Sequence, residues 1–193
     1  MGDRIGARKS RRPRLPTMID EAAIKGEVVM HDALSKRQFV LPAFVTAAVI
    51  IVDQVSKAWA LRSLSETDLR HVIWTLHLGL RYNSGMAFSQ GQGKGPFIAL
   101  AAVVVVFALA WSLRSKRSVL GVIAVGLVMG GALGNVADRL FRAKDGLMSG
   151  HVIDFIDFRW WPAFNVADMG VVVGAFLLLL ESWRHGRQPK SAS

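Results

Sequence analysis

Residues 151–180 read HVIDFIDFRWWPAFNVADMGVVVGAFLLLL, and this stretch decides the class of fold. Its second half belongs to an apolar run that is long enough to cross the hydrocarbon core of a bilayer as a helix. Its first half places three carboxylates, Asp154, Asp157 and Asp168, beside the start of that helix. An intramembrane carboxylate costs several kcal/mol unless a partner or a function uses it. The stretch therefore predicts a membrane protein with functional carboxylates at one membrane surface.

The composition of the whole chain agrees with this class. Of its 193 residues, 52% are hydrophobic, which is too apolar for an ordinary soluble domain. The net charge of +10 could suggest a nucleic-acid partner, but the basic residues concentrate in the first 38 residues and in RSKRS at 114–118. Anchoring at the membrane interface explains that pattern better, so we expect no nucleic acid. The absence of cysteine excludes disulfides, thiolate metal ligands and thiol nucleophiles.

Four apolar windows of roughly 18 to 21 residues predict four transmembrane helices. An even number places both termini on the same side of the membrane. The segments on that side hold most of the Lys and Arg residues, so the positive-inside rule assigns both termini to the cytoplasm. The windows lie near 39–59, 96–113, 119–137 and 163–183.

The first window has a second interpretation, as a cleavable signal peptide. Lys36 and Arg37 precede its apolar run, and Ala58-Trp59-Ala60 resembles a cleavage site. Asp53 and Lys57 interrupt the run just before that site, and three further windows follow. A first transmembrane helix therefore fits better.

The remaining segments divide the chain into three parts. Residues 1–38 are basic and lack a sustained apolar period, which predicts a disordered cytoplasmic arm. Residues 39–183 form the membrane domain, and residues 184–193 form a cytoplasmic tail. Within the membrane domain, residues 69–89 partly alternate and end in an Asn-x-Gly turn signal, which predicts a small extracytoplasmic β-rich element.

Polar and charged residues gather at the outer end of the predicted helices. Asp53 and Lys57 lie at the favourable i, i+4 spacing for a helical ion pair, which predicts a structural bridge. Glycine repeats in the third and fourth windows let helix backbones approach closely, and they predict that the polar ends of these helices meet. The residues expected at this common depth are Asp53, Asn135, Asp138, Asp154, Asp157, Asn165 and Asp168.

Two carboxyl groups held close together in a partly desolvated site share one proton near neutral pH. Such a pair offers an acid and a base, which is sufficient to hydrolyse a peptide bond without metal, thiol or serine. Asp154 and Asp168 are candidates, but spacing alone does not separate them from Asp138 or Asp157. Asp138 precedes Arg139 and could anchor the end of its helix, and Asp157 could be a solvated loop carboxylate.

Two other classes remain open on spacing alone. The same carboxylates could hold Mg²⁺ in an enzyme that transfers or hydrolyses a lipid phosphate. A transporter is less consistent with the sequence, because transport sites lie near the bilayer midplane between repeated halves, and no repeat is visible. The five histidines are scattered without an H-E-x-x-H motif, so a zinc hydrolase has little support.

Five motifs in order resemble those of signal peptidase II, the bacterial lipoprotein signal peptidase, and the resemblance covers about residues 39–183. It implies an all-α membrane protein, an aspartic endopeptidase with four transmembrane helices and no metal or cofactor. Its partners would be membrane lipids and a prolipoprotein that carries diacylglycerol on a cysteine, cut on the amino side of that cysteine. The motifs are DQVSK at 53–57, NSGMAFS at 83–89, GGALGNVADRL at 130–140, HVIDF at 151–155 and FNVAD at 164–168.

The resemblance also implies roles for individual residues. The catalytic pair of the family falls on Asp154 and Asp168. Two positions depart from the family, since Met86 and Met169 stand where smaller residues are usual. The other matches are Asn83, Asn135, Arg139 and Asn165 as polar residues that line and orient the substrate site, Asp53 and Lys57 as a supporting pair, and Asp138 as structural support.

Further expectations concern the surroundings of the site. The family implies that residues 60–95 form a β-cradle and a short periplasmic helix that clamp the substrate. It also implies a location in the bacterial inner membrane with the site near the periplasmic face, and inhibition by globomycin, a cyclic peptide.

Overall fold

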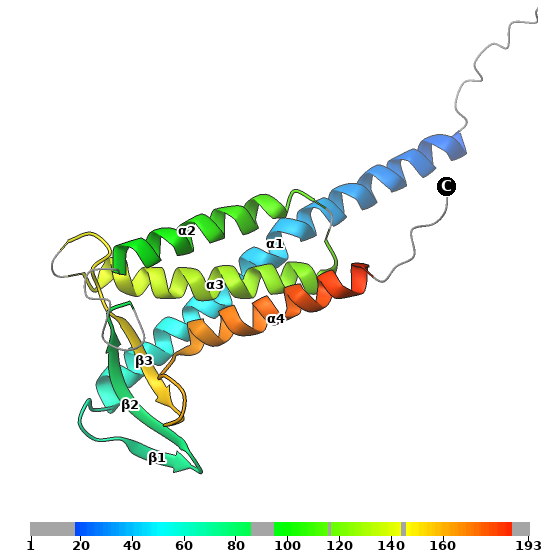
Figure 1. Cartoon of the computed structure of the whole chain (residues 1–193). Helices are drawn as coiled ribbons and strands as arrows, with labels where there is room; N and C mark the ends of the chain where they lie inside the picture. Colours follow the sequence, from blue (N-terminus) through cyan, green and yellow to red (C-terminus); the bar gives the residue numbers. More distant parts are fainter. Residues whose placement is uncertain (1–17, 86–94, 116, 144–145, 187–193) are drawn as a thin grey trace, which may run out of the picture. The chain divides into compact units, whose positions relative to one another are not determined.

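The computed structural model describes residues 18–85, 95–115, 117–143 and 146–186. Its element order is α1–β1–β2–α2–α3–β3–α4 (Figure 1). The helices are α1 (Met18–Ser63), α2 (Gly95–Ser112), α3 (Val119–Phe141) and α4 (Val166–Gly186), and the strands are β1 (Arg70–Ile73), β2 (Leu76–Asn83) and β3 (Val152–Asp157).

Four helices of the described residues are long and apolar enough to cross a membrane, which confirms the four predicted spans. Large apolar side chains such as Phe44, Phe107 and Phe176 are exposed on them, as is usual where a helix faces lipid rather than water. The third span ends at Phe141 rather than at residue 137, so its polar residues lie inside the helix. The spans are Gln38–Ser63, Gly95–Ser112, Val119–Phe141 and Val166–Arg184.

The N-terminal segment is described from Met18 onward, as part of helix α1. Helix α1 begins at Met18, and the division of the chain into two compact units falls after Lys36. Ala, Glu, Lys and Met each occur at least twice in residues 18–37, and these residues favour helix. Residues 1–17 and 187–193 lie outside the described residues, so the cytoplasmic location of the arm and of the tail stays a prediction.

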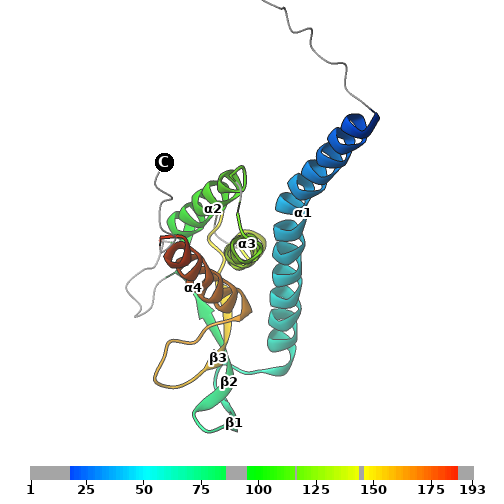
Figure 2. The same cartoon turned by 90° about the vertical axis from the view of Figure 1, so that its right-hand side faces the viewer.

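Helix α3 is the central helix of the membrane domain and the most buried of the four spans. Figure 2 shows it end-on, with α2 and α4 on one side and α1 on the other. A Cβ added at Gly130 would lie 2.7 Å from Val49 Cβ, so this glycine lets α1 approach α3 closely. On the opposite side, Gly174 of α4 faces the Ala124 carbonyl of α3 in the same way.

The glycine repeat of α4, Gly170 and Gly174, therefore packs on α3 as predicted, whereas the repeat of α3 packs on α1 at Gly126 and Gly130 and approaches α4 at Gly134. Gly131, which lies outside that repeat, also approaches α4, because its Cα faces the Ala167 carbonyl. Gly134 touches both neighbours: an added Cβ would lie 2.8 Å from Asp53 Oδ2 and 3.3 Å from Ala167 Cβ.

A three-stranded antiparallel sheet of order β1-β2-β3 lies at the end of the helices where α1 and α3 finish and α2 and α4 start (Figure 1). Strands β1 and β2 confirm the β-rich element expected in residues 69–89. Strand β3 was not predicted, and it pairs with β2 so that Arg81 lies opposite Asp154. The expected periplasmic helix stays a prediction, since residues 86–94 lie outside the described residues.

One face of the sheet packs on the last turn of α1. Leu80 of β2 and both Ile153 and Phe155 of β3 form a small buried core with Ala60. Side chains alternate along a strand, so Asp154, between Ile153 and Phe155, points to the other face. The sheet thereby holds one carboxylate against the ends of α3 and α4.

Candidate active site

The structure brings the predicted site residues together from five elements at the sheet end of the helices. These elements are far apart in sequence, so the cluster depends on helix packing and on strand pairing. Its members are Asp53 and Lys57 on α1, Asn83 on β2, Asn135, Asp138 and Arg139 on α3, Asp154 on β3, Asn165 just before α4, and Asp168 in its first turn.

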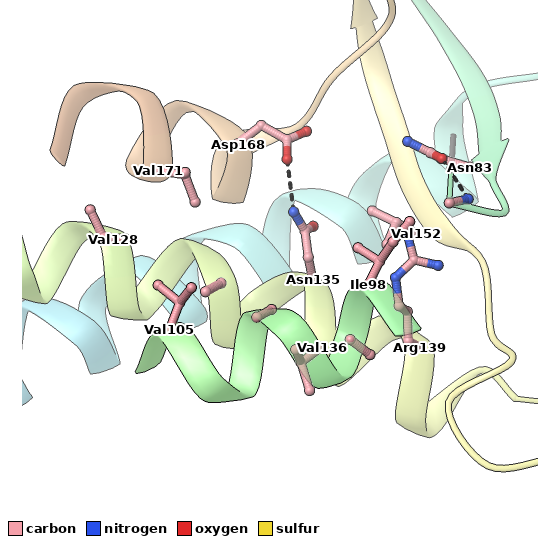
Figure 3. Close-up of a pocket in the computed structure, with 14 residues that line it drawn as sticks. Asn83, Ile98, Val105, Val128, Asn135, Val136, Arg139, Val152, Asp168 and Val171 are labelled. Carbon is pink, nitrogen blue, oxygen red and sulfur yellow. Dashed lines mark hydrogen bonds between the residues drawn. The ribbon is translucent and has the colours of Figure 1, made fainter. Parts of the chain in front are cut away.

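Asp154 and Asp168 are linked through two asparagine amides. Asn165 Nδ2 donates to Asp154 Oδ1 at 2.7 Å and to Asn135 Oδ1 at 3.1 Å. Asn135 Nδ2 in turn donates to Asp168 Oδ1 at 2.7 Å (Figure 3). Both carboxylates are therefore held in one hydrogen-bonded chain.

Each carboxylate also accepts a second hydrogen bond on its other oxygen. Asn83 Nδ2 donates to Asp154 Oδ2 at 3.0 Å, and the backbone N–H of Asn165 donates to Asp168 Oδ2 at 3.2 Å. Four N–H donors thus fix the planes of the two carboxyl groups.

Asp154 is almost completely buried, with 2% of its surface exposed. Burial raises its pKa from 3.8 to about 7, the hydrogen bonds from Asn83 and Asn165 oppose that rise, and the charge of Asp168 adds to it. At neutral pH this carboxyl group therefore exchanges between its protonated and ionised forms, as general acid–base chemistry requires.

Beside this pair, Lys57 is a completely buried cation that serves three partners. Its Nζ lies 2.8 Å from Asp53 Oδ2 and 2.8 Å from Asp138 Oδ2. It also donates to Asn135 Oδ1 at 3.0 Å, which connects the ion pairs to the chain of amides. The predicted i, i+4 ion pair between Asp53 and Lys57 is present, and it extends to α3.

Asp138 and Asp157 have partners away from the Asp154–Asp168 pair. Asp138 pairs with Lys57 and Arg142, and its Oδ2 accepts from the backbone N–H of Ile153 at 3.2 Å. Asp157 is buried on β3, so the expectation of a solvated loop carboxylate was wrong. Its Oδ1 accepts from the backbone N–H of Arg159 at 2.7 Å, in a turn that follows the strand.

Carboxylates and imidazoles do not gather as a metal site would require. Within the described ranges there is no group of three or more His, Asp or Glu side chains that could hold a metal ion. Each of the four carboxylates proposed for a Mg²⁺ site instead accepts from lysine, arginine, amide or backbone donors.

A cavity of about 400 Å³ opens beside Asp168 (Figure 3). Its polar end carries Asn83, Asn135 and Arg139, and its walls along α2, α3 and α4 are small or branched apolar side chains. Arg139 is 5% exposed, and the one hydrogen bond recorded for its side chain among the described residues is to the Gly150 carbonyl at 3.5 Å. The guanidinium group therefore has donors available to a molecule in the cavity.

Sequence reasoning missed the contribution of α2 and of Gln54. Ala99 and Ala102 of α2 line the cavity, but they lie in a uniformly apolar run without any local signal. Gln54 Nε2 donates to Asp138 Oδ1 at 3.2 Å and to the Gly134 carbonyl at 3.2 Å. Its place between Asp53 and Lys57 was the available signal. Met169 is exposed and does not line the cavity, and Met86 lies outside the described residues.

Known proteins resemble this chain over the whole site. The family model described as signal peptidase (SPase) II matches residues 45–184. A lipoprotein signal peptidase of Syntrophomonas wolfei is 43% identical over 134 residues, which are 68% of this chain and 85% of that protein. One of Rhodococcus jostii is 42% identical over 142 residues, which are 71% of this chain and 70% of that protein.

The fold has a counterpart among solved structures. A bacterial membrane enzyme superposes with a TM-score of 0.70 at 26% sequence identity, and the match covers 80% of this chain and 95% of the other. The residues matched by the family model include most of the first span, the other three spans and the sheet.

Proposed function

Because this chain belongs to the signal peptidase II family and is a multi-pass membrane protease, we propose that it removes the signal peptide from diacylglyceryl-modified prolipoproteins. The cut falls on the amino side of the lipidated cysteine. The relatives that carry the name lipoprotein signal peptidase support this substrate class.

The observation that carries the mechanism is the amide-linked pair of carboxylates. Asp154 and Asp168 share one proton, and the asparagine amides hold their carboxyl planes in place before the substrate arrives. The ionised partner takes a proton from water while the protonated partner donates to the carbonyl oxygen of the scissile peptide. The water oxygen adds to the carbonyl carbon and gives a gem-diol. Its C–N bond then breaks as one carboxyl group donates a proton to the leaving amine and the other takes a proton from a gem-diol hydroxyl, which leaves a carboxylic acid.

The cavity next to the pair is suited to the substrate chain. Its apolar walls accept side chains of the signal peptide, and Arg139 and Asn83 face its polar end, where backbone carbonyls need donors. A lipidated peptide has acyl chains that stay in the bilayer and a peptide bond that needs water, and a site at the ends of membrane-spanning helices serves both.

The distribution of basic residues supports one orientation in the membrane. Most of the basic residues outside the site lie in the two terminal segments and in the α2–α3 connection, which supports cytoplasmic termini and a site at the periplasmic side of the bacterial inner membrane. The absence of cysteine permits a direct test by single substitutions. Ser115→Cys, in the α2–α3 connection, should be protected from an impermeant maleimide in spheroplasts, whereas Thr67→Cys, exposed near the sheet, should be labelled. The reverse pattern would invert the orientation.

The function is tested with the purified protein in detergent with EDTA, on a diacylglyceryl-modified prolipoprotein and on its unmodified form. Cleavage of the lipidated form alone supports the proposal, and globomycin should inhibit it. Release of phosphate from a lipid phosphate that EDTA abolishes and Mg²⁺ restores would support the rival, a lipid-phosphate enzyme. A wild-type protein that cuts neither form would overturn the proposal.

A further inference from the structure

Asn165 is the N-cap residue of α4, which begins at Val166. Its Oδ1 accepts from the backbone N–H of Asp168 at 3.0 Å, and Asp168 Oδ2 accepts from the backbone N–H of Asn165 at 3.2 Å. This reciprocal pair is a capping box, with Asn and Asp in place of the usual Ser or Thr and Glu. The carboxylate of Asp168 is therefore held by the start of its own helix.

The cap also fixes which way the Asn165 amide points. A backbone N–H is only a donor, so the side-chain oxygen must face it and the NH₂ group must face the opposite way. On that side lie Asp154 Oδ1 at 2.7 Å and Asn135 Oδ1 at 3.1 Å. The cap geometry thus determines that the NH₂ group of Asn165, and not its side-chain oxygen, faces Asp154.

The neighbouring amide is fixed by the same logic. Asn135 Oδ1 accepts from Lys57 Nζ, which is only a donor, so Asn135 Nδ2 faces Asp168. The Asn165 amide therefore donates to Asp154, and the Asn135 amide donates to Asp168. Asn165 contacts both carboxylates, because its backbone N–H also donates to Asp168.

Asn165 differs from the other amides of the site in its relation to the cavity. It is completely buried and does not line the cavity, in contrast to Asn83, Asn135 and Arg139. The resemblance implied a polar residue that lines and orients the substrate site, and the hydrogen bonds of Asn165 favour the second of these roles.

We propose that Asn165 is a positioning residue that sets the geometry of the Asp154–Asp168 pair, because the N-cap of α4 forces its NH₂ group onto Asp154 while its backbone holds Asp168. This inference rests on the proposed function and adds a role for one residue to it.

The role has a signature in the pH dependence. The charged groups that act on Asp154 are Lys57 of α1, Arg139 of α3 and Asp168 of α4, and Arg81 lies opposite it on β2. The hydrogen bond from Asn165 lowers the pKa of Asp154 against the effect of burial. Loss of this hydrogen bond should raise the pKa of Asp154 further. The alkaline limb of the activity profile, where activity declines as pH rises, should then move to higher pH.

The experiment compares substitutions that keep the cap. Serine and aspartate are as good as asparagine at the N-cap, but Asn165→Ser removes the NH₂ donor and Asn165→Asp turns an oxygen toward Asp154. Asn83→Ser is the matched control, because it removes the other amide donor to Asp154 without touching a helix cap. For each variant kcat, KM, the pH profile and the melting temperature in detergent are measured on the lipidated substrate.

We expect both Asn165 variants to melt within a few degrees of the wild type. For Asn165→Ser, kcat should fall about 10²-fold with little change in KM, as misplacement of a reacting group does, and the limb should move to higher pH. In Asn165→Asp, kcat should fall further than in Asn165→Ser, because the new carboxylate repels that of Asp154. Asn83→Ser should move the limb in the same direction.

Wild-type kcat and pH profile in Asn165→Ser would overturn the proposal, since capping alone would then explain the residue. A raised KM with unchanged kcat and profile would also overturn it, in favour of substrate contact. The same holds if neither Asn165 variant folds, because the amide would then be a requirement of the fold. A wild-type protein without cleavage is the distinct result that overturns the proposed function, and the positioning role falls with it.

Discussion

Lys57 of α1 and Asp138 of α3 form a completely buried ion pair, with 2.8 Å between Nζ and Oδ2. The same ammonium group lies 2.8 Å from Asp53 Oδ2, one turn earlier in α1. One cation therefore neutralises two buried carboxylates and joins the first helix to the central one beside the candidate active site.

Lys57→Met should destabilise the protein strongly. Removal of one partner from a buried ion pair leaves uncompensated charge and costs about 3–5 kcal/mol. The melting temperature in detergent should fall, and activity should fall with it, because Asn135 loses the donor that orients its amide. Arg142→Met is the matched control, since Arg142 also pairs with Asp138 but is 30% exposed. Its loss should cost less than the loss of Lys57, because Asp138 keeps Lys57 as its partner. Equal losses in the two variants would contradict the special role of Lys57.

Asp154→Asn and Asp168→Asn should each abolish cleavage of the lipidated substrate while the protein stays folded. Loss of the acid–base group costs roughly 10²- to 10⁴-fold or more in rate. Asp157→Asn makes the same chemical change on the same strand, and its side-chain oxygen still accepts from Arg159 N–H, so its rate should stay close to wild type. Near-wild-type cleavage by Asp154→Asn would move the catalytic assignment to another carboxylate.

Cleavage by the wild type should decline as pH rises through about 7. Burial raises the pKa of Asp154 to about 7, so its protonated form is present below that pH and is lost above it. A bell-shaped profile results, because the partner carboxylate must be ionised on the acid side. The profile is measured as kcat/KM on the lipidated substrate in EDTA, with Asp157→Asn expected to give the same profile. An activity that still increases up to pH 9 would contradict this assignment.

The stability of the protein should also decrease as pH rises, because the folded state binds more protons than the unfolded chain. The pKa of Asp154 is about 7 in the folded protein and about 4 in the unfolded chain. Between these values the folded state binds more protons, so the contribution of Asp154 to stability is full at low pH and is lost as pH rises through 7. Asp154→Asn should remove this decline, which melting curves from pH 5 to pH 8 would reveal. Parallel curves for both proteins would argue against a raised pKa.

Gly134→Ala should impair activity more than Gly130→Ala, one turn away in the same repeat. A Cβ at Gly134 would lie 2.8 Å from Asp53 Oδ2, and Asp53 accepts from the Ala167 N–H in the first turn of α4. A Cβ at Gly130 meets Val49 and the Thr46 carbonyl instead, away from the polar cluster. Both variants should lose thermal stability, but the cleavage rate per folded molecule should fall mainly in Gly134→Ala. Equal specific activities would show that Asp53 can move without consequence.

The strand that carries Asp154 shows why part of the fold escaped prediction. Residues 152–157 are buried almost throughout, so they lack the alternation that marks a half-exposed strand. A short apolar run of this kind cannot be told from other buried segments by periodicity. Strand β2 was accessible to prediction because its pattern includes exposed residues and ends at a turn signal.

The glycines show a similar limit. The four-residue repeats of α3 and α4 correctly indicated close helix contacts, but the repeat of α3 packs mainly on α1 and reaches α4 only at Gly134, beside Gly131. A glycine repeat indicates that one face of a helix carries small residues and allows close approach. It does not indicate which helix packs against that face.

The sequence by itself determined the number of spans and the gathering of polar residues at one end of them. Both follow from the length and the position of apolar runs, which are local properties of the chain. Only the tertiary structure decided which donor meets which carboxylate, as in the bonds of Asn165 to Asp154 and of Lys57 to Asp138. These contacts join elements far apart in sequence, and their register is set by helix packing and strand pairing, which no local pattern records.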